Sequence, residues 1–247
     1  MKTAAILIIG NEILSGRTRD ANLQLLAKGL AARGVRLLET RVVADRFEAI
    51  VAGVNALRAS HDYVFTTGGI GPTHDDITTE CVAAAFGRRV AEDPEAVRRL
   101  VEYYGPEAIN EARLRMARVV SGASLIDNPV SAAPGFRIEN VFVLPGVPRI
   151  LEAMLEDVMS HLPQGAPIAS RSVTVWLRES EIATTLSNIQ DAHPMVDIGS
   201  YPFAREERLG TSLVVRGTAP EAVAQAISAI TDMLRASGAE FTLDTPV

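Results

Sequence analysis

The chain alternates buried strands with amphipathic helices, and this alternation constrains the fold more than any other feature. Residues 4–9 are a continuous apolar run, which is typical of a strand buried on both faces of a parallel sheet. Asp20 then caps a helix that carries its leucines on one face, and Gly34 ends it. Strands over residues 35–43 and 63–67 follow, separated by a helix that begins after Asp45. The pattern predicts an α/β fold whose doubly wound, mostly parallel sheet has helices on both faces.

Further elements complete the first part of the chain. The sequence predicts helices over residues 75–86, from Asp93-Pro94 onward, over 106–119 and over 149–161, with short strands between 124 and 144. Glu139-Asn140 is expected to be the turn of a hairpin between two of those strands. The composition changes at residues 163–167, where Pro-Gln-Gly-Ala-Pro predicts a linker. We therefore expect a first domain over residues 1–164.

A second, smaller domain is expected after the linker. The predicted strands cover residues 172–177, 196–203 and 212–216, and the predicted helices cover 180–192 and 220–236, with space for a final strand. Their order along the chain is strand, helix, strand, strand, helix. That βαββα order predicts a small α+β domain over residues 168–247.

The composition excludes several classes of protein. The net charge is −6, and the arginine-rich segment 113–118 is expected to be a solvated helix face, so we predict no nucleic-acid partner. The single cysteine, Cys81, excludes an intramolecular disulfide, and its apolar neighbours favour a buried thiol over a nucleophile. The first apolar run is too short for a signal peptide and no stretch is long enough for a membrane span, so a cytoplasmic protein is expected. Apolar helix faces beside the sheet favour a homo-oligomer.

Three of the predicted strands end in loops that contain glycine. Their sequences are GNE at residues 10–12, TTGGIGPTHDD at residues 66–76 and LPGVP at residues 144–148. Ligands of open parallel sheets bind beyond the carboxyl ends of the strands. The three loops are therefore expected to gather at one edge of the sheet and to form a binding crevice there.

The loop at residues 66–76 has the composition of a phosphate cradle. Gly68, Gly69 and Gly71 allow backbone N–H groups to turn toward an anion, and the positive end of the following helix adds to the attraction. The loop is not a Walker A motif, because no Gly-Lys-Ser/Thr follows. It is not a dinucleotide fingerprint either, because the third glycine of that motif is missing.

Asp75 and Asp76 follow the cradle directly. Two carboxylates beside a phosphate repel it unless a cation lies between them. The pair therefore predicts a divalent ion such as Mg²⁺, held by Asp75 and Asp76 together with phosphate oxygens. The simpler alternative is that Thr73 and Asp76 form a capping box at the start of a helix. The two interpretations are compatible, because one aspartate can cap while the other holds metal.

Other polar residues near the loops have open alternatives. Glu12 could reach the crevice, or it could begin a helix. Asn22 could face the loops, although a solvent-facing side chain is favoured. His74 could touch a phosphate, or it could be an ordinary loop histidine. No other histidine has metal-ligand spacing to a second one, and no Ser-His-Asp set can be assembled.

The motifs as a set resemble those of a known family. TGGIGPTHDDIT at residues 67–78 is preceded by GNEILSGRTRDAN at 10–22 and followed by NPVSAAPGF at 128–136 and by LPGVP. This set is similar to the molybdopterin-binding (MoaB/Mog-like) domain, in the form found at the N-terminus of the CinA-type competence/damage-inducible family. The resemblance covers about residues 1–162, and the order of elements in the small domain also matches that family.

The resemblance implies roles for individual residues. Gly68, Gly69 and Gly71 would bind the phosphate of a pterin or nucleotide. Asp75 and Asp76 would handle the metal and the chemistry, Asp76 above all. The further substrate-binding residues that it implies are Thr67, Pro72, Thr73 and His74 in the same loop, and Gly10, Glu12, Asn22, Asn128, Gly146 and Pro148 around the crevice.

The resemblance also implies an activity. Members of the Mog type adenylylate molybdopterin, and the CinA-type branch is associated with hydrolysis of phosphoanhydrides in ADP-ribose-like or FAD-like dinucleotides. A metal-dependent nucleotide pyrophosphatase that uses Mg²⁺, Co²⁺ or Mn²⁺ is therefore expected. The alternatives are adenylylation or carriage of molybdopterin, and a non-catalytic module that binds a pterin or nucleotide.

The chain departs from the family pattern at several places. Members often have lysine where His74 stands, and proline where Val120 stands. The first difference removes a fixed positive charge beside the cradle. Members of the CinA type usually continue into an amidohydrolase domain, whereas this chain ends at Val247, so that activity is not expected.

Overall fold

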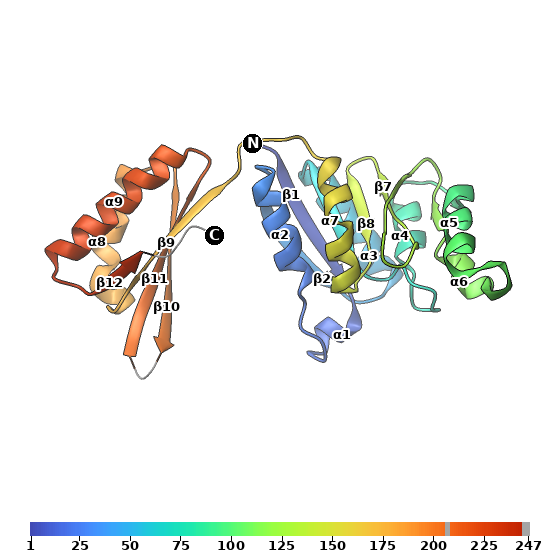
Figure 1. Cartoon of the computed structure of the whole chain (residues 1–247), viewed down its shortest axis with the longest axis horizontal. Helices are drawn as coiled ribbons and strands as arrows, with labels where there is room; N and C mark the ends of the chain where they lie inside the picture. The colour runs from blue at the N-terminus through green and yellow to red at the C-terminus, as the bar shows by residue number, and fades with distance from the viewer. Residues whose placement is uncertain (206–207, 244–247) are drawn as a thin grey trace. The chain divides into compact units, whose positions relative to one another are not determined.

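The computed structural model describes residues 1–205 and 208–243 of the chain. It contains two compact units, Met1–Gly165 and Ala166–Val247 (Figure 1). The first unit carries all of the predicted site residues. Each unit is described by itself below.

A six-stranded sheet forms the centre of the first unit. Its strands, in sheet order, are β2 (Arg36–Val43), β1 (Thr3–Ile9), β3 (Tyr63–Thr67), β8 (Val141–Leu144), β7 (Gly135–Ile138) and β6 (Ser124–Ile126). The first four strands are parallel, whereas β7 runs antiparallel to β8 and β6 antiparallel to β7. The hairpin between β7 and β8 turns at Glu139 as predicted, with a φ of 52° at that residue. The predicted mostly parallel sheet is confirmed.

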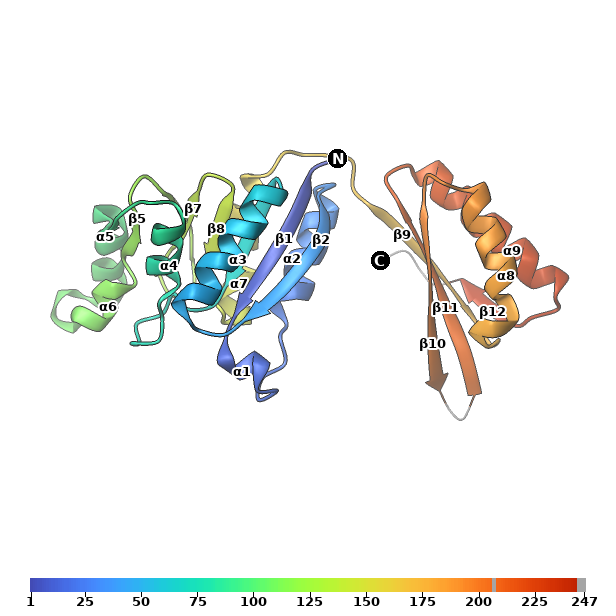
Figure 2. The same ribbon diagram turned by 180° about the vertical axis from the view of Figure 1, so that it is seen from behind.

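Helices cover both faces of this sheet (Figures 1 and 2). On one face lie α2 (Asn22–Ala32) and α7 (Pro148–Ser160), and on the other lie α3 (Phe47–Ser60) and α4 (Thr78–Ala85). Successive side chains of β1 point to opposite faces and enter the two cores in turn. Both faces of the strand are therefore buried, which explains its continuous apolar run. The doubly wound α/β fold is confirmed.

The start of α4 differs from the prediction. The helix begins at Thr78, three residues after the predicted start at Asp75. The Thr78 N–H donates to the Gly69 carbonyl at 2.9 Å and closes the loop onto the first turn of the helix. Asp75 and Asp76 therefore lie in the loop before α4. By contrast, α5 (Pro94–Tyr104) begins where predicted, and the Asp93 carboxylate accepts hydrogen bonds from its first N–H groups.

The prediction of one helix over residues 106–119 is wrong. The segment forms a short 3₁₀ turn, the helix α6 (Glu111–Arg115) and the strand β5 (Arg118–Val120). Asn110 separates the turn from α6, because its side chain accepts a hydrogen bond from the Arg113 N–H at 2.9 Å and so caps a new helix. Strand β5 pairs with β4 (Val90–Glu92), a strand that the sequence analysis missed. This pairing buries valine side chains that a helix would have exposed in part.

The second unit is an antiparallel sheet with two helices packed on one face. Its elements are β9 (Ala169–Val175), α8 (Glu179–Ala192), β10 (Asp197–Arg205), β11 (Arg208–Gly217), α9 (Pro220–Ala236) and β12 (Phe241–Leu243), and the strand order is β10-β11-β9-β12. The predicted small α+β domain is confirmed, and residues 244–247 of that prediction lie outside the described residues. Within residues 1–205 and 208–243, no helix has the length and apolar composition that crossing a membrane requires.

Cys81 in α4 is fully buried in the core beside α3, as the sequence predicts. Burial raises the pKa of its thiol to about 12, with smaller contributions from the charges of Glu80 and Glu48.

We expect Ellman's reagent to label Cys81 of the native protein only through unfolding, and to label it at once in denaturant. The unfolded thiol ionises at lower pH than the folded one. The free energy of unfolding is therefore expected to fall as the pH rises from about 9 toward 12. Fast labelling of the native protein at neutral pH would contradict this account.

Candidate functional site

The loops that follow β1, β3 and β8 meet at one edge of the sheet. The Gly68 N–H donates to the Leu144 carbonyl at 3.1 Å. A Cβ on Gly68 would lie 2.2 Å from the Ile9 carbonyl oxygen, and a Cβ on Gly146 would lie 3.2 Å from the Cα of Gly68. The three glycine-containing loops are therefore in mutual contact at the carboxyl ends of the parallel strands.

The conformation of the central loop depends on two glycines and a threonine. Gly68 and Gly69 have φ values of 103° and 69°, which glycine adopts far more readily than other residues. The buried Thr78 hydroxyl donates to the Gly68 carbonyl at 2.9 Å, and a Cβ on Gly69 would lie 2.2 Å from that hydroxyl. Thr78 thus holds the loop against α4. No role was predicted for Thr78, and the signal for one is its position at a helix start, seven residues after Gly71.

Asp76 is held by Thr73 beside the glycine loop. One carboxylate oxygen, Oδ2, accepts hydrogen bonds from the Thr73 N–H at 2.8 Å and from the Thr73 hydroxyl at 2.5 Å. The carboxylate lies over Gly71, where a Cβ would come within 2.7 Å of Oδ2. The other oxygen, Oδ1, accepts no hydrogen bond from the described residues. The capping-box interpretation is wrong for α4, because Thr73 and Asp76 bond to each other before that helix begins.

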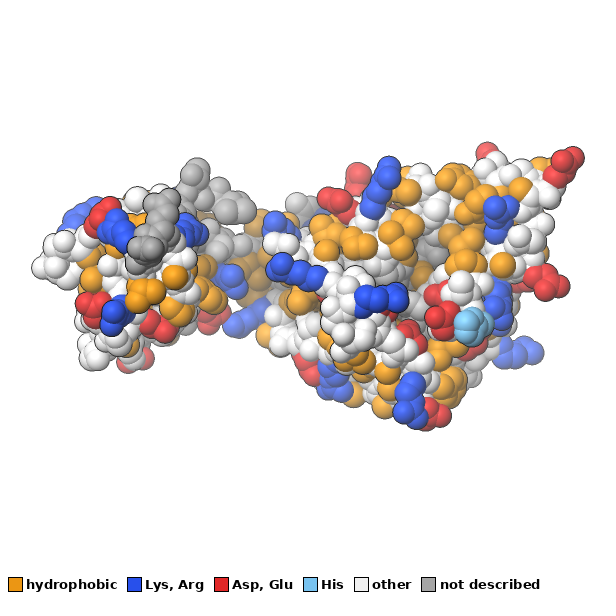
Figure 3. Space-filling view, turned by 90° about the horizontal axis from the view of Figure 1, so that it is seen from below, with side chains coloured by type: hydrophobic (Ala, Val, Ile, Leu, Met, Phe, Trp, Pro, Cys, Tyr) orange, Lys and Arg blue, Asp and Glu red, His pale blue; other side chains and the backbone are white. Residues whose placement is uncertain are grey.

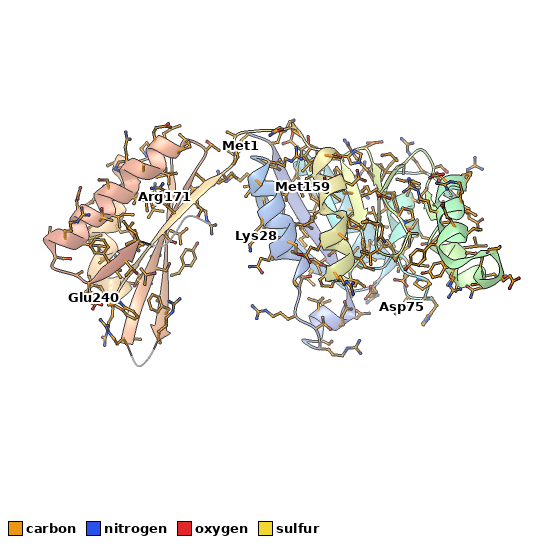
Figure 4. The ribbon with its side chains drawn as sticks, in the orientation of Figure 1. Met1, Lys28, Asp75, Met159, Arg171 and Glu240 are labelled. Atoms are coloured by element: carbon orange, nitrogen blue, oxygen red, sulfur yellow. The ribbon has the colours of Figure 1, made fainter. Side chains whose placement is uncertain are left out.

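Asp75 and His74 lie at the exposed tip of the same loop. Figure 4 shows Asp75 at the edge of the unit opposite to Met1, where β1 begins. The Asp75 side chain is 67% exposed and that of His74 is 95% exposed, with 3.9 Å between Oδ1 and Nδ1. The nearby Thr73 hydroxyl, whose hydrogen is donated to Asp76, the backbone N–H of Asp75 and His74 together hold the pKa of the Asp75 carboxyl below its ordinary value. Asp75 is therefore ionised at neutral pH.

Glu12 lies at the start of a helix, and its carboxylate lies against the glycine loop after β1. It lies in the first turn of the short helix α1 (Asn11–Leu14), whose start is held by a 2.7 Å hydrogen bond from the Asn11 N–H to the Asp45 carboxylate. The Glu12 carboxylate turns back toward Gly10, where a Cβ would come within 2.5 Å of Oε1. A third carboxylate therefore lies in the loop after β1.

Asn22 is buried, so the favoured prediction of a solvent-facing side chain is wrong. It is the first residue of α2 and is only 3% exposed, because the loop after β8 packs over it. Its Nδ2 donates to the Gly146 carbonyl at 2.8 Å. Its Oδ1 and the hydroxyl of Thr67 are buried without a hydrogen-bond partner among the described residues. Unpaired buried polar atoms are costly, so this edge has unused hydrogen-bonding capacity for water or ligand.

The remaining predicted site residues, Pro72, Pro148 and Asn128, lie in three different segments of the first unit. Pro72 is an exposed loop residue, and Pro148 is the first residue of α7. Asn128 organises its own loop: its Nδ2 donates to the Ala133 carbonyl and the Ser131 hydroxyl, and its Oδ1 accepts from the backbone. All hydrogen-bonding atoms of the Asn128 side chain are thus occupied, and Asn128 lies in a hollow beside α5.

A pocket of about 140 Å³ lies on the outer side of the glycine loop. Its lining residues are Ile70, Gly71, His74, Asp76 and Ile77 from the loop, Thr79 and Glu80 from α4, Arg115 from α6 and Arg118 from β5. Figure 3, which views the molecule from below, shows a histidine between acidic and basic side chains on this end of the first unit. The pocket therefore brings carboxylates and guanidinium groups together.

A divalent ion at Asp75 and Asp76 would have to take most of its ligands from outside the protein. Among residues 1–205 and 208–243, no three His, Cys, Asp or Glu side chains are grouped so that they could hold a metal ion. Mg²⁺ commonly takes only one or two carboxylates and fills its remaining positions with phosphate oxygens and water. The free Oδ1 of Asp76 and the exposed carboxylate of Asp75 can supply those two ligands.

Comparison with protein families agrees with this architecture. A family model described as "Probable molybdopterin binding domain" matches residues 5–164, which is more than half of the chain. The chain belongs to this family. A second model, described as "FAD synthase, middle domain", matches residues 167–241 of this molybdopterin-binding family member. The two matched regions follow the two structural units.

Several curated proteins are similar over nearly the whole chain. A protein from Aeropyrum pernix is 35% identical, over 94% of this chain and 92% of its own length. A probable FAD synthase from Caenorhabditis elegans is 32% identical over 94% of this chain, and a CinA-like protein from Fervidobacterium nodosum is 30% identical over 95% of it. The chain spans only 50% and 58% of the lengths of these last two proteins.

A solved structure supports the same assignment. The crystal structure of a CinA protein of unknown function from Thermoplasma acidophilum is 34% identical, with a TM-score of 0.59. The match covers 63% of this chain and 94% of the CinA chain. The MoaB/Mog-like molybdopterin-binding fold and the resemblance to the CinA type, both predicted from the sequence motifs, are confirmed.

Proposed function

We propose that this protein binds a phosphorylated pterin or nucleotide at its glycine loop and hydrolyses a phosphoanhydride bond. The proposal includes a divalent ion, Mg²⁺, Mn²⁺ or Co²⁺, at Asp75 and Asp76. The observation that carries the proposal is the position of Asp76, which Thr73 holds beside Gly71 with one carboxylate oxygen free. A capping box would contain the same hydrogen bond from the Thr73 N–H, but α4 begins only at Thr78, so Asp76 does not cap that helix.

The chain's own residues would bind and orient the substrate. The backbone N–H groups of residues 69–71 and the N-terminus of α4 would attract and position the phosphate chain, whereas the Gly68 N–H is already bonded to the Leu144 carbonyl. The hydrogen bonds from Thr73 to Asp76 and from Thr78 to Gly68 keep the carboxylate and the loop in a fixed relation. A bound divalent ion would polarise a phosphoryl oxygen or make a water molecule more acidic.

The similar proteins favour a dinucleotide as substrate. One matched relative is named a probable FAD synthase, and the second unit matches a model of the FAD synthase middle domain. We therefore propose an FAD-like or ADP-ribose-like dinucleotide. Addition of water across the phosphoanhydride of FAD gives FMN and AMP, and addition to ADP-ribose gives AMP and ribose 5-phosphate. As the sequence predicts, the proposed enzyme acts in the cytoplasm as a homo-oligomer.

The test is a panel assay on the purified full chain. FAD, ADP-ribose, other dinucleotides, and molybdopterin with ATP are each incubated with Mg²⁺, Mn²⁺ or Co²⁺, and the products are separated by chromatography. We expect AMP from at least one dinucleotide, and loss of that AMP when a chelator is added. Adenylylated molybdopterin without AMP release from a dinucleotide would favour the adenylyltransferase alternative. Binding without any turnover would overturn the enzymatic proposal and leave a binding module.

A further inference from the structure

Two arginines of segment 113–118 line the pocket beside Asp76. Arg115 is the last residue of α6 and Arg118 is the first residue of β5, and both line the pocket together with residues of the glycine loop. The expectation that this segment is only a solvated helix face does not hold for these two residues. Arg113, in the same segment, does not line the pocket: it stacks on the Tyr104 ring, with 4.2 Å between its guanidinium carbon and the ring centre.

Both pocket arginines are loosely held. The Arg118 guanidinium forms an ion pair with Glu80 at 3.0 Å. The Arg118 side chain is 34% exposed and the Glu80 side chain is 38% exposed. The Arg115 guanidinium lies 3.5 Å from the Thr73 carbonyl oxygen, which is at the long limit of a hydrogen bond. Partly exposed ion pairs of this kind contribute little to stability, so their partners can be exchanged at low cost.

The loop itself contains no fixed positive charge. Its only basic residue is His74, which is 95% exposed and lies 3.9 Å from Asp75, between Nδ1 and Oδ1. Asp75, Asp76 and Glu80 would therefore repel a phosphate that approached this side of the loop. The two guanidinium groups offset the two pocket carboxylates, and a divalent ion at Asp75 and Asp76 would make the pocket attractive for an anion.

The size of the pocket restricts what part of a substrate it can take. Pockets that bury a whole small molecule are commonly about 300–1,000 Å³. At about 140 Å³ this pocket has room for a phosphoryl group and some water, but not for a pterin or a nucleoside. Planar guanidinium groups match the oxygens of such a group and form charge-assisted hydrogen bonds to it.

We propose that Arg115 and Arg118 form the anion subsite for one phosphoryl group of the substrate's diphosphate. In this arrangement Glu80 competes with the phosphoryl group for Arg118. The inference rests on the proposed function, because it assigns the place of the diphosphate relative to Asp76. In this subsite, Arg115 of α6 and Arg118 of β5 provide the fixed positive charge that the glycine loop itself does not contain.

The test measures binding of a non-hydrolysable diphosphate. Imidodiphosphate is titrated by calorimetry into the full chain in the presence of Mg²⁺. Arg115→Ala and Arg118→Ala are each expected to raise the Kd about tenfold, because each removes charge-assisted hydrogen bonds. Glu80→Gln is expected to lower the Kd about threefold, because it frees the Arg118 guanidinium. Arg113→Ala is the matched control and is expected to change the Kd by less than about twofold.

Several results would overturn the inference. One is a Kd for imidodiphosphate that the two pocket variants leave unchanged, and another is a Kd that Arg113→Ala raises as much as they do. Weaker binding by Glu80→Gln at an unchanged unfolding midpoint would contradict the competition of Glu80 with the phosphoryl group for Arg118. If Arg118→Ala does not fold, Arg118→Lys is used, and it is expected to raise the Kd less than alanine does. The expected pattern of Kd values without turnover of any dinucleotide would support the subsite and reject the proposed hydrolysis.

Discussion

Replacing Asp76 with asparagine is expected to lower metal-dependent turnover by about 100- to 1,000-fold, with little loss of stability. Asparagine has the shape of aspartate and can still present an oxygen to the Thr73 N–H and hydroxyl, so the loop should keep its conformation. It cannot supply the negative oxygen that is free in Asp76. Calorimetric titration with Mn²⁺ should show weaker metal binding in the variant, and this measurement does not depend on knowing the substrate.

The control for Asp76→Asn is Asp232→Asn, which removes an exposed carboxylate in α9 of the second unit. This control should keep both turnover and Mn²⁺ binding. Circular dichroism and the urea midpoint should match among the wild type and both variants. Unchanged turnover in Asp76→Asn, at unchanged stability, would reject the assigned role of the acidic pair. The protein would then be a binding module or would use another group.

Replacing Gly68 with alanine is expected to lower the free energy of unfolding by about 4 kcal/mol. Two effects add. The φ of 103° is strained for any residue with a Cβ, and the added Cβ would lie 2.2 Å from the Ile9 carbonyl oxygen, which is backbone and cannot rotate away. Relief of the clash requires the loop to move away from β1, so ligand binding should be lost together with stability.

The matched control for Gly68→Ala is Gly87→Ala, at the end of α4. Gly87 has a φ of 61°, but a Cβ there would have no neighbour within 4 Å. This variant should cost only the strain of the positive φ, about 1 kcal/mol. Urea unfolding with an unchanged m value is the measurement for both. Equal costs for the two variants would mean that the loops after β1 and β3 are not in close contact.

Most of the helices and strands can be predicted from the sequence because the signals for them lie in residues that are close together along the chain. The run at residues 4–9 is apolar on both faces, and in the structure it enters two separate cores, as such a run must. Asp93 caps α5 through its own carboxylate, and the turn at Glu139 joins β7 to β8 between two short apolar runs that are adjacent in sequence. The family motifs in the glycine loops likewise predicted the domain type that the family model matches.

The errors arise where contacts distant in sequence outweigh local preference. Residues 106–119 carry a helical pattern, yet pairing with β4 converts the end of that segment to a strand. Thr73 and Asp76 have capping-box spacing, yet the Thr78 hydrogen bonds to Gly68 and Gly69 set the helix start later. Asn22 has the polarity of a surface residue, yet the loop after β8 covers it and accepts its N–H.

The candidate site divides in the same way. The sequence by itself determined which strands end in glycine loops and that two aspartates follow the central one, because these are properties of neighbouring residues. Only the tertiary structure decided that Asp76 keeps one oxygen free, that Glu12 lies over Gly10, and that Arg115 and Arg118 line a pocket with the loop. The physical reason is that these positions depend on contacts between different elements, such as α1 with β2, β5 with α4 and α6 with α5. Spacing along the chain does not record that packing.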